Sequence, residues 1–231
     1  MADTPYLQLL RLLFAIFWIC LIACKAPTPL QGPPEPDTPV LAEVKAHALE
    51  FHQEVLEIGS GVYVAVGFGL ANSIMIEGDD GVIIVDCMGT LESATKVKAA
   101  FRKITNKPVK ALIFTHNHGD HIFGAEVMAG EDHPEVYAHA LTNYYIDRVL
   151  NLIRPVVTLR SVRMFGMELP PEEVHHCGIG PRIKVEDGTR VGILRPTVTF
   201  EDSLSIEVAG VRLQMVHAPG ETDDQLFVWM P

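Results

Sequence analysis

The chain has 231 residues, a formal net charge of −11, 48% hydrophobic residues and 20% charged residues. This length and composition suit one globular domain with a substantial core. The acidic balance argues against binding to a phosphate backbone, so we expect no nucleic-acid partner. A small anionic substrate stays compatible with it, because metal ions supply local positive charge.

The first 24 residues predict an export leader. Residues 12–23 form an uninterrupted apolar run that has the length of a signal-peptide core and is short for a membrane span. The run ends in Leu-Ile-Ala-Cys, which resembles the bacterial lipobox, where the cysteine (here Cys24) is lipidated after cleavage. An ordinary secretory signal or a short anchor stays open as the alternative. We therefore expect an exported protein that is periplasmic or tethered to a membrane.

Residues 25–41 are rich in proline and predict an extended linker before a folded domain at 42–231. Hydrophobic periodicity then predicts helices at 44–54, 91–104, 120–129 and 139–153, and strands at 61–66, 71–77, 82–86, 109–114, 136–138, 197–200, 204–208, 211–216 and 225–230. Residues 154–196 predict a long loop with helical turns. Because helices must cover sheet faces and the strands are too many for one small sheet, we expect an α/β fold with two stacked sheets and outer helices.

The sequence Thr-His-Asn-His-Gly-Asp-His at 115–121 carries most of the chemical information. Imidazole and carboxylate groups are the ligands that zinc prefers at catalytic sites. His116 and His118 are two residues apart and can point the same way from an extended segment. Asp120 and His121 follow Gly119, which we expect to let the chain turn toward a second metal ion. The segment follows a buried strand, and loops at strand ends commonly present catalytic groups.

This segment and two further features resemble the metallo-β-lactamase superfamily, whose fold is an αββα sandwich of metal-dependent hydrolases. The other two are the strand end at Val85-Asp86 and the sequence Ala-Pro-Gly-Glu-Thr at 218–222, which precedes a hydrophobic strand. Most members have histidine where this chain has Glu221, and that histidine completes the first metal site. A carboxylate at this position resembles the alkylsulfatase branch, which hydrolyses alkyl sulfate esters such as detergents.

The resemblance implies a ligand set and a mechanism. His116, His118 and Glu221 would hold one Zn²⁺, and Asp120 and His121 would contribute to a second one. Water held by the metal ions would attack the sulfate ester, with Asp120 as the catalytic residue that orients it. Two alternatives concern the first metal: Glu221 as a surface turn residue, and His217 as the ligand in its place.

The substrate of this branch would be a small amphiphilic sulfate ester. Its alkyl tail needs an apolar groove, which the hydrophobic residues of 146–170 can supply, although ordinary core positions are the alternative for most of them. Of the two cysteines in the folded domain, Cys87 and Cys177, neither has the spacing of a metal motif.

The position of Pro231 adds one more expectation. Family members continue beyond this point with further metal ligands, and alkylsulfatases add a dimerisation domain, so we expect a truncated sandwich that lacks its C-terminal side. Such a chain would hold one tight metal ion at most and would form a homodimer only with the missing region. The alternatives are another hydrolase of the same fold (a β-lactamase, thioesterase or lactonase) and a non-catalytic, membrane-tethered zinc-binding fragment. Glu221 argues against the first group.

Overall fold

The computed structural model describes residues 39–170, 172–183 and 188–231. The chain divides into two units, residues 1–41 and 42–231. The predicted leader and most of the predicted linker lie outside the described residues, and residues 39–41 begin helix α2 (Pro39–Ala48). Within the described part, no helix is long and apolar enough to cross a membrane.

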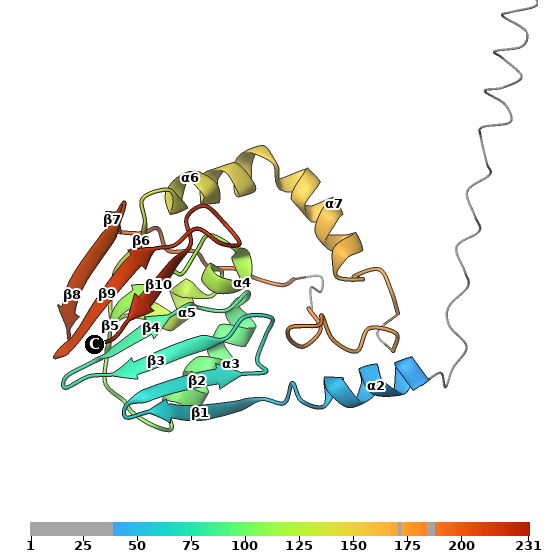
Figure 1. Cartoon of the computed structure of the whole chain (residues 1–231), viewed down its shortest axis with the longest axis horizontal. Helices are drawn as coiled ribbons and strands as arrows, with labels where there is room; N and C mark the ends of the chain where they lie inside the picture. Colours follow the sequence, from blue (N-terminus) through green and yellow to red (C-terminus); the bar gives the residue numbers. More distant parts are fainter. Residues whose placement is uncertain (1–38, 171, 184–187) are drawn as a thin grey trace, which may run out of the picture. The chain divides into compact units, whose positions relative to one another are not determined.

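The second unit contains a seven-stranded mixed sheet (Figure 1). Its strands follow each other in chain order: β1 (Glu54–Gly59), β2 (Val62–Val66), β3 (Ser73–Glu77), β4 (Val82–Val85), β5 (Val109–Ile113), β6 (Glu135–His139) and β7 (Val198–Phe200). Strands β1 to β4 pair antiparallel, whereas β4 to β7 pair parallel. The carboxyl ends of β4 to β7 therefore meet at one edge of the sheet.

A second, three-stranded sheet packs against the first. It has the order β10-β9-β8 and consists of β8 (Ser203–Val208), β9 (Val211–His217) and β10 (Leu226–Trp229). Its inner residues Leu213, Met215 and Leu226 share one buried cluster with Ile83 and Ile113 of the large sheet. Residues alternate along β8 between exposed and half-buried, which is the pattern of a strand with one face on a core.

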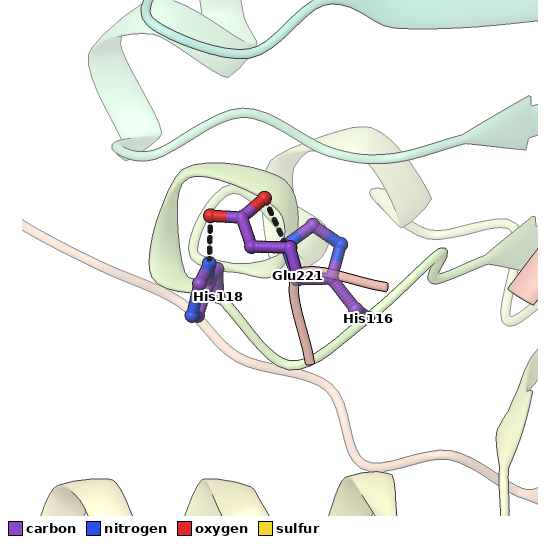
Figure 2. Close-up of side chains that lie close together, drawn as sticks. All are labelled: His116, His118 and Glu221. Atoms are coloured by element: carbon purple, nitrogen blue, oxygen red, sulfur yellow. Dashed lines mark ion pairs between the residues drawn. The ribbon is translucent and has the colours of Figure 1, made fainter. Parts of the chain in front are cut away.

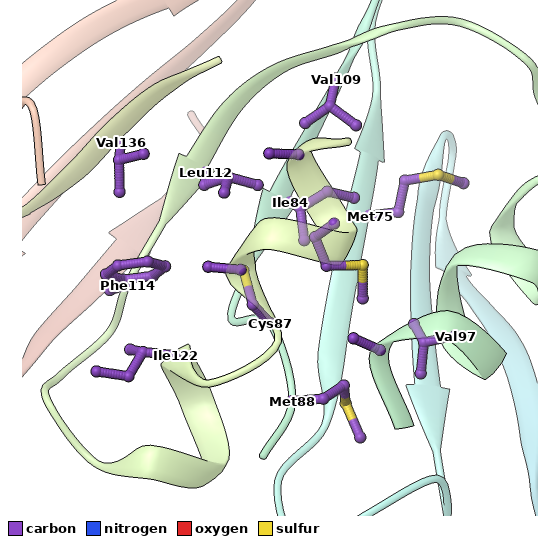
Figure 3. Packing of buried hydrophobic residues seen from close by; sticks show 14 of the residues in the cluster. Met75, Ile84, Cys87, Met88, Val97, Val109, Leu112, Phe114, Ile122 and Val136 are labelled. Carbon is purple, nitrogen blue, oxygen red and sulfur yellow. The ribbon is translucent and has the colours of Figure 1, made fainter. Parts of the chain in front are cut away.

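Helices cover the other face of the large sheet. α3 (Leu91–Phe101), α5 (Ala125–Ala129) and α6 (Thr142–Asp147) contribute buried side chains to a second cluster, with Val97, Met128 and Ile146 among them. Figure 3 shows this packing around Met75, Ile84 and Phe114. The layers are therefore helices, large sheet and small sheet, which confirms the predicted α/β class with two stacked sheets.

The structure corrects three predicted elements. The helix predicted at 44–54 begins earlier, in α2, and residues 54–59 instead form the edge strand β1. The region 120–129 holds two short helices, α4 (Gly119–Ile122) and α5. The predicted loop at 154–196 contains a regular helix, α7 (Arg154–Met164), which follows a π-helical turn, η1 (Arg148–Leu152).

Candidate metal centre

The ligand segment 115–121 leaves β5 at the edge where the parallel strands end. His116 is buried there, with 2% of its surface exposed. The Thr115 hydroxyl donates to Asp86 Oδ2 at 2.7 Å, so its oxygen accepts from His116 Nδ1 at 3.1 Å. This arrangement places the proton of His116 on Nδ1 and leaves a lone pair on Nε2. His116 Nε2 is buried and has no hydrogen-bond partner.

Glu221 meets both histidines from the loop between β9 and β10 (Figure 2). Its Oε1 lies 3.2 Å from His118 Nδ1, and its Oε2 lies 3.8 Å from His116 Nε2. One ligand atom from each of the three residues lies within 4.8 Å of the other two. Two imidazoles and a carboxylate are a known ligand set of catalytic zinc. The unpartnered His116 Nε2 fits this use, because a buried polar atom normally has a partner.

Asp120 and His121 lie beside this group. His121 Nδ1 donates to Asp86 Oδ2 at 2.6 Å, and its Nε2 lies 3.5 Å from Asp120 Oδ2. The rings of His116 and His121 are 4.1 Å apart between centroids. In the described part of the chain, only His116, His118 and Glu221 form a group of three candidate ligands. The second metal position therefore remains a prediction with two nearby side chains.

Asp86 holds the ligand segment in place through three hydrogen bonds. Its carboxylate accepts from Thr115 N at 2.8 Å, from the Thr115 hydroxyl and from His121. Its φ of 59° lies in the left-handed region, which Asp tolerates better than most residues. Ser73 Oγ donates to the Asp86 carbonyl at 2.7 Å and so holds this conformation. The sequence signal for Asp86 was its place at the end of an apolar strand.

The pKa values of His116 and His121 are shifted in opposite directions. Burial lowers the pKa of His116, and the neighbouring His121 and His118 lower it further. Burial also acts to lower the pKa of His121, but the hydrogen bond that His121 donates to Asp86 and the charges of Asp86, Asp120 and Glu221 outweigh it and raise that pKa. The neutral form of His116 is the form that binds a metal ion.

Comparison with known families decides the family of this fold and site. The model of the metallo-beta-lactamase superfamily matches residues 66–231. The chain belongs to the metallo-beta-lactamase superfamily. The match includes the ligand segment and the loop that carries Glu221.

The curated relatives of this superfamily member include alkylsulfatases. The linear primary-alkylsulfatase of Pseudomonas sp. (strain ATCC 19151) is 36% identical over 165 residues, which are 68% of this chain and 30% of that protein. The alkyl/aryl-sulfatase BDS1 of Saccharomyces cerevisiae is 30% identical over 189 residues, 77% of this chain and 28% of that protein. The chain thus spans less than a third of the length of these relatives.

Solved structures confirm the superfamily fold. The stereoselective inverting sec-alkylsulfatase Pisa1 from Pseudomonas sp. matches with a TM-score of 0.71 at 22% identity, over 78% of this chain and 30% of that chain. FEZ-1 metallo-beta-lactamase from Legionella gormanii matches with a TM-score of 0.51 at 17% identity, over 76% of this chain and 57% of that one. At these identities the likeness concerns the fold alone.

Other residues singled out in the sequence lie outside the group of three. His217 Nε2 donates to the Asp223 carbonyl at 2.6 Å, and its ring stacks on His139 with the centroids 3.8 Å apart, so the structure does not place His217 in the group with His116 and His118. Cys87 is fully buried in the core beneath the helices. Gly119 does not have a positive φ. A Cβ there would lie 2.5 Å from the Phe123 ring, so close packing rather than a turn explains this glycine.

The hydrophobic residues of 146–170 are mostly not core positions. Ile146 is buried, but Leu152, Met164 and Leu169 are exposed. The core alternative is therefore wrong for these three. Val156 and Leu159 of the same region are exposed as well. α6, at the start of this region, touches the Glu221 loop, because the Tyr145 hydroxyl donates to Asp223 at 2.6 Å.

Three polar residues near the site had no predicted role. Asn117, Thr142 and Asp224 are all buried and are joined by hydrogen bonds. Asn117 lies inside the quoted motif, but Asp224 is 107 positions away, so only tertiary structure shows the link.

Proposed function

We propose that the protein is a metal-dependent hydrolase of alkyl sulfate esters and that zinc is its metal ion. The convergence of His116, His118 and Glu221 carries this proposal, because it supplies a zinc ligand set with a carboxylate in place of the usual third histidine. The similarity to curated alkylsulfatases supports the substrate class. A β-lactamase, thioesterase or lactonase reaction is less well supported, since none of the curated relatives described above has such a name.

A divalent metal ion held by these three residues would lower the pKa of a water molecule and supply a nucleophile near neutral pH. Thr115 fixes the ring of His116 through Nδ1, so the Nε2 lone pair faces the ligand group. The carboxylate of Glu221 adds a negative charge that a histidine would not. With a metal ion bound, this charge would make the site less positive and the water a stronger base.

We assign Asp120 as the residue that interacts with the attacking water molecule. Its carboxylate is 30% exposed and lies beside His121 Nε2, so it is accessible from solvent. We assign it the role of orienting the water and accepting its proton. The overall reaction converts the ester and water to an alcohol and hydrogen sulfate. His121 is held by Asp86 and keeps its Nε2 directed toward Asp120.

The alkyl chain of the substrate is assigned to the exposed apolar residues of η1 and α7. Leu152, Val156 and Leu159 are each more than half exposed. Arg148, Arg154 and Arg160 stand among them in sequence, and positive charge beside apolar surface suits an anionic amphiphile.

Sulfate release from dodecyl sulfate tests this function. The protein loaded with Zn²⁺ should release sulfate, a chelator should stop the release, and added Zn²⁺ should restore it. Glu221→Ala should abolish turnover, whereas Glu207→Ala, an exposed carboxylate on β8, should leave it unchanged. Bound zinc without any sulfate release would reject the alkyl sulfate hydrolase and leave another hydrolase of this fold or the zinc-binding fragment.

A further inference from the structure

The buried carboxylate of Asp224 joins the two loops that carry the candidate ligands. Asp224 has no exposed surface. Its Oδ1 accepts from Asn117 Nδ2 at 2.6 Å and from the Thr222 hydroxyl at 2.7 Å, and its Oδ2 accepts from the Thr142 hydroxyl at 2.8 Å. A buried carboxylate is costly unless hydrogen bonds replace its lost hydration, and these three donors do so.

Asn117 is the member of this network from the ligand segment. It lies between His116 and His118 in the chain, and 7% of its surface is exposed. Residues 115–117 form a bend after β5 rather than a strand. The hydrogen bond from Asn117 to Asp224 therefore fixes the backbone between the two histidines.

Thr222 is the member from the other loop, and it directly follows Glu221. The Glu221 side chain is 62% exposed, so packing alone does not fix it. Its backbone is fixed instead: Glu221 N donates to Gln225 Oε1 at 2.6 Å, and Leu226 N donates to the Thr115 carbonyl at 2.9 Å. In the chain, Asp224 lies between Glu221 and Leu226, whose amides donate these two hydrogen bonds.

We propose that Asp224 is a positioning residue that holds the Glu221 turn against the His116–His118 segment, so that the ligand atoms converge before a metal ion binds. The expected effect on metal binding rests on the proposed function. The expected order of the Glu221 turn in the metal-free protein rests on the hydrogen bonds alone. A pre-organised site loses less conformational freedom on binding, which raises affinity. Thr142, the first residue of α6, donates to the same carboxylate and so connects this helix to the network.

A reciprocal exchange of side chains tests the proposal. Asp224→Asn replaces one of the two acceptor oxygens of this carboxylate with an amide donor, and Asn117→Asp places two carboxylates opposite each other, whereas the double variant restores one donor and one acceptor. We expect each single variant to raise the Kd for Zn²⁺ by about 10–100-fold, which is the range for loss of a residue that orients the metal-binding side chains. The double variant should recover most of this loss. Merely structural damage would not be rescued in this way.

Hydrogen exchange on the metal-free protein provides a readout that needs no metal. The backbone amides of Glu221 and Leu226 should exchange faster in Asp224→Asn than in the wild type. Asp132→Asn is the matched control, since Asp132 accepts from Val109 N at 2.9 Å far along the chain from Glu221. It should change neither exchange in the 221–226 turn nor the Kd. If Asp224→Asn does not fold, Thr222→Val removes one donor and should produce the same changes to a smaller degree.

The outcomes separate this inference from the proposed function. If the wild type binds Zn²⁺ and Asp224→Asn binds it as tightly as Asp132→Asn does, the positioning role of Asp224 is wrong and the metal site stands. If the wild type binds no Zn²⁺, the proposed function fails. The exchange measurement then decides on Asp224, and unchanged exchange in the 221–226 turn would overturn its role.

Discussion

Asp86 and His121 are joined by a hydrogen bond of 2.6 Å between Oδ2 and Nδ1, and this bond connects the end of β4 to the ligand segment after β5. The two strands are parallel neighbours, so their carboxyl ends meet at one edge. Asp86 thereby fixes one histidine of the segment directly and, through Thr115, a second one. The strand pairing of the sheet is thus transmitted to the orientation of the candidate ligands.

Replacement of Asp86 should be strongly destabilising. Asp86→Ala leaves the Thr115 amide, the Thr115 hydroxyl and His121 without their acceptor, and an unsatisfied buried polar group costs about 1–3 kcal/mol. Asp86→Asn should cost less, because Asn tolerates the left-handed backbone and keeps one acceptor oxygen. Urea unfolding measures both. Asp80→Ala is the control, since its exposed ion pair with Lys110 should contribute at most about 1 kcal/mol. Equal losses for Asp86→Ala and Asp80→Ala would contradict the role of Asp86.

Gly119→Ala should disturb the helix that carries Asp120. The new Cβ would lie 2.5 Å from Phe123 Cε2, so the ring or the helix must move, and overpacking of this kind costs about 1–3 kcal/mol. Thermal unfolding gives the loss. Combining it with Phe123→Leu, which removes the ring, should recover stability relative to the sum of the two single changes. Strictly additive losses would show that the clash is not the cause.

His139 should make the fold sensitive to mild acid. Burial lowers the pKa of His139 and the charge of His217 lowers it further, against smaller opposing effects of Glu201 and Asp224. Because the folded pKa is below the unfolded value of about 6.5, the unfolded chain takes up a proton first as the pH falls. Stability is therefore complete above about pH 6.5 and falls toward the folded pKa. Protonation also removes the Nδ1 acceptor of Leu141 N.

The variant His139→Gln checks this sign. Its free energy of unfolding should be lower than that of the wild type at neutral pH, but it should depend less on pH below about 6.5. Urea unfolding at a series of pH values measures both quantities. A slope equal to that of the wild type would assign the acid sensitivity to other groups.

The two cysteines of the described part should differ in reactivity. Burial raises the pKa of the Cys87 thiol well above its usual range, and the charge of Asp86 raises it further, so no thiolate is exposed to reagents. Cys177 is half-buried in the region after α7. Native iodoacetamide labelling followed by peptide mass spectrometry should modify Cys177 and leave Cys87 unmodified. Modification of Cys87 at the same rate would contradict its burial.

Local signals were sufficient for much of the fold. The apolar runs of β4 and β5 predict strands, and both strands are fully or almost fully buried. The strand β1 was missed because its residues are mostly exposed and it lies at the edge of the sheet, where the apolar alternation is weak. The regular helix α7 was missed because none of its residues is buried, so it has no continuous apolar stripe.

The site shows the same division between local and tertiary information. His116 and His118 follow from their spacing in one segment, and Glu221 follows from its place in a second motif. The contact between Glu221 and His118 was expected only from the resemblance, and the structure places them 3.2 Å apart. The bond from Asn117 to Asp224 had no sequence signal, because it depends on how the small sheet packs on the large one.

Titration of the metal-free protein with Zn²⁺ tests the central claim most directly. His116, His118 and Glu221 should bind one equivalent tightly, and Asp120 with His121 should not hold a second one as tightly. Glu221→Ala should weaken binding by more than the roughly 10–100-fold expected for a residue behind the ligands, while Glu207→Ala should leave the Kd unchanged. Two tight equivalents, or an unchanged Kd in Glu221→Ala, would contradict the account.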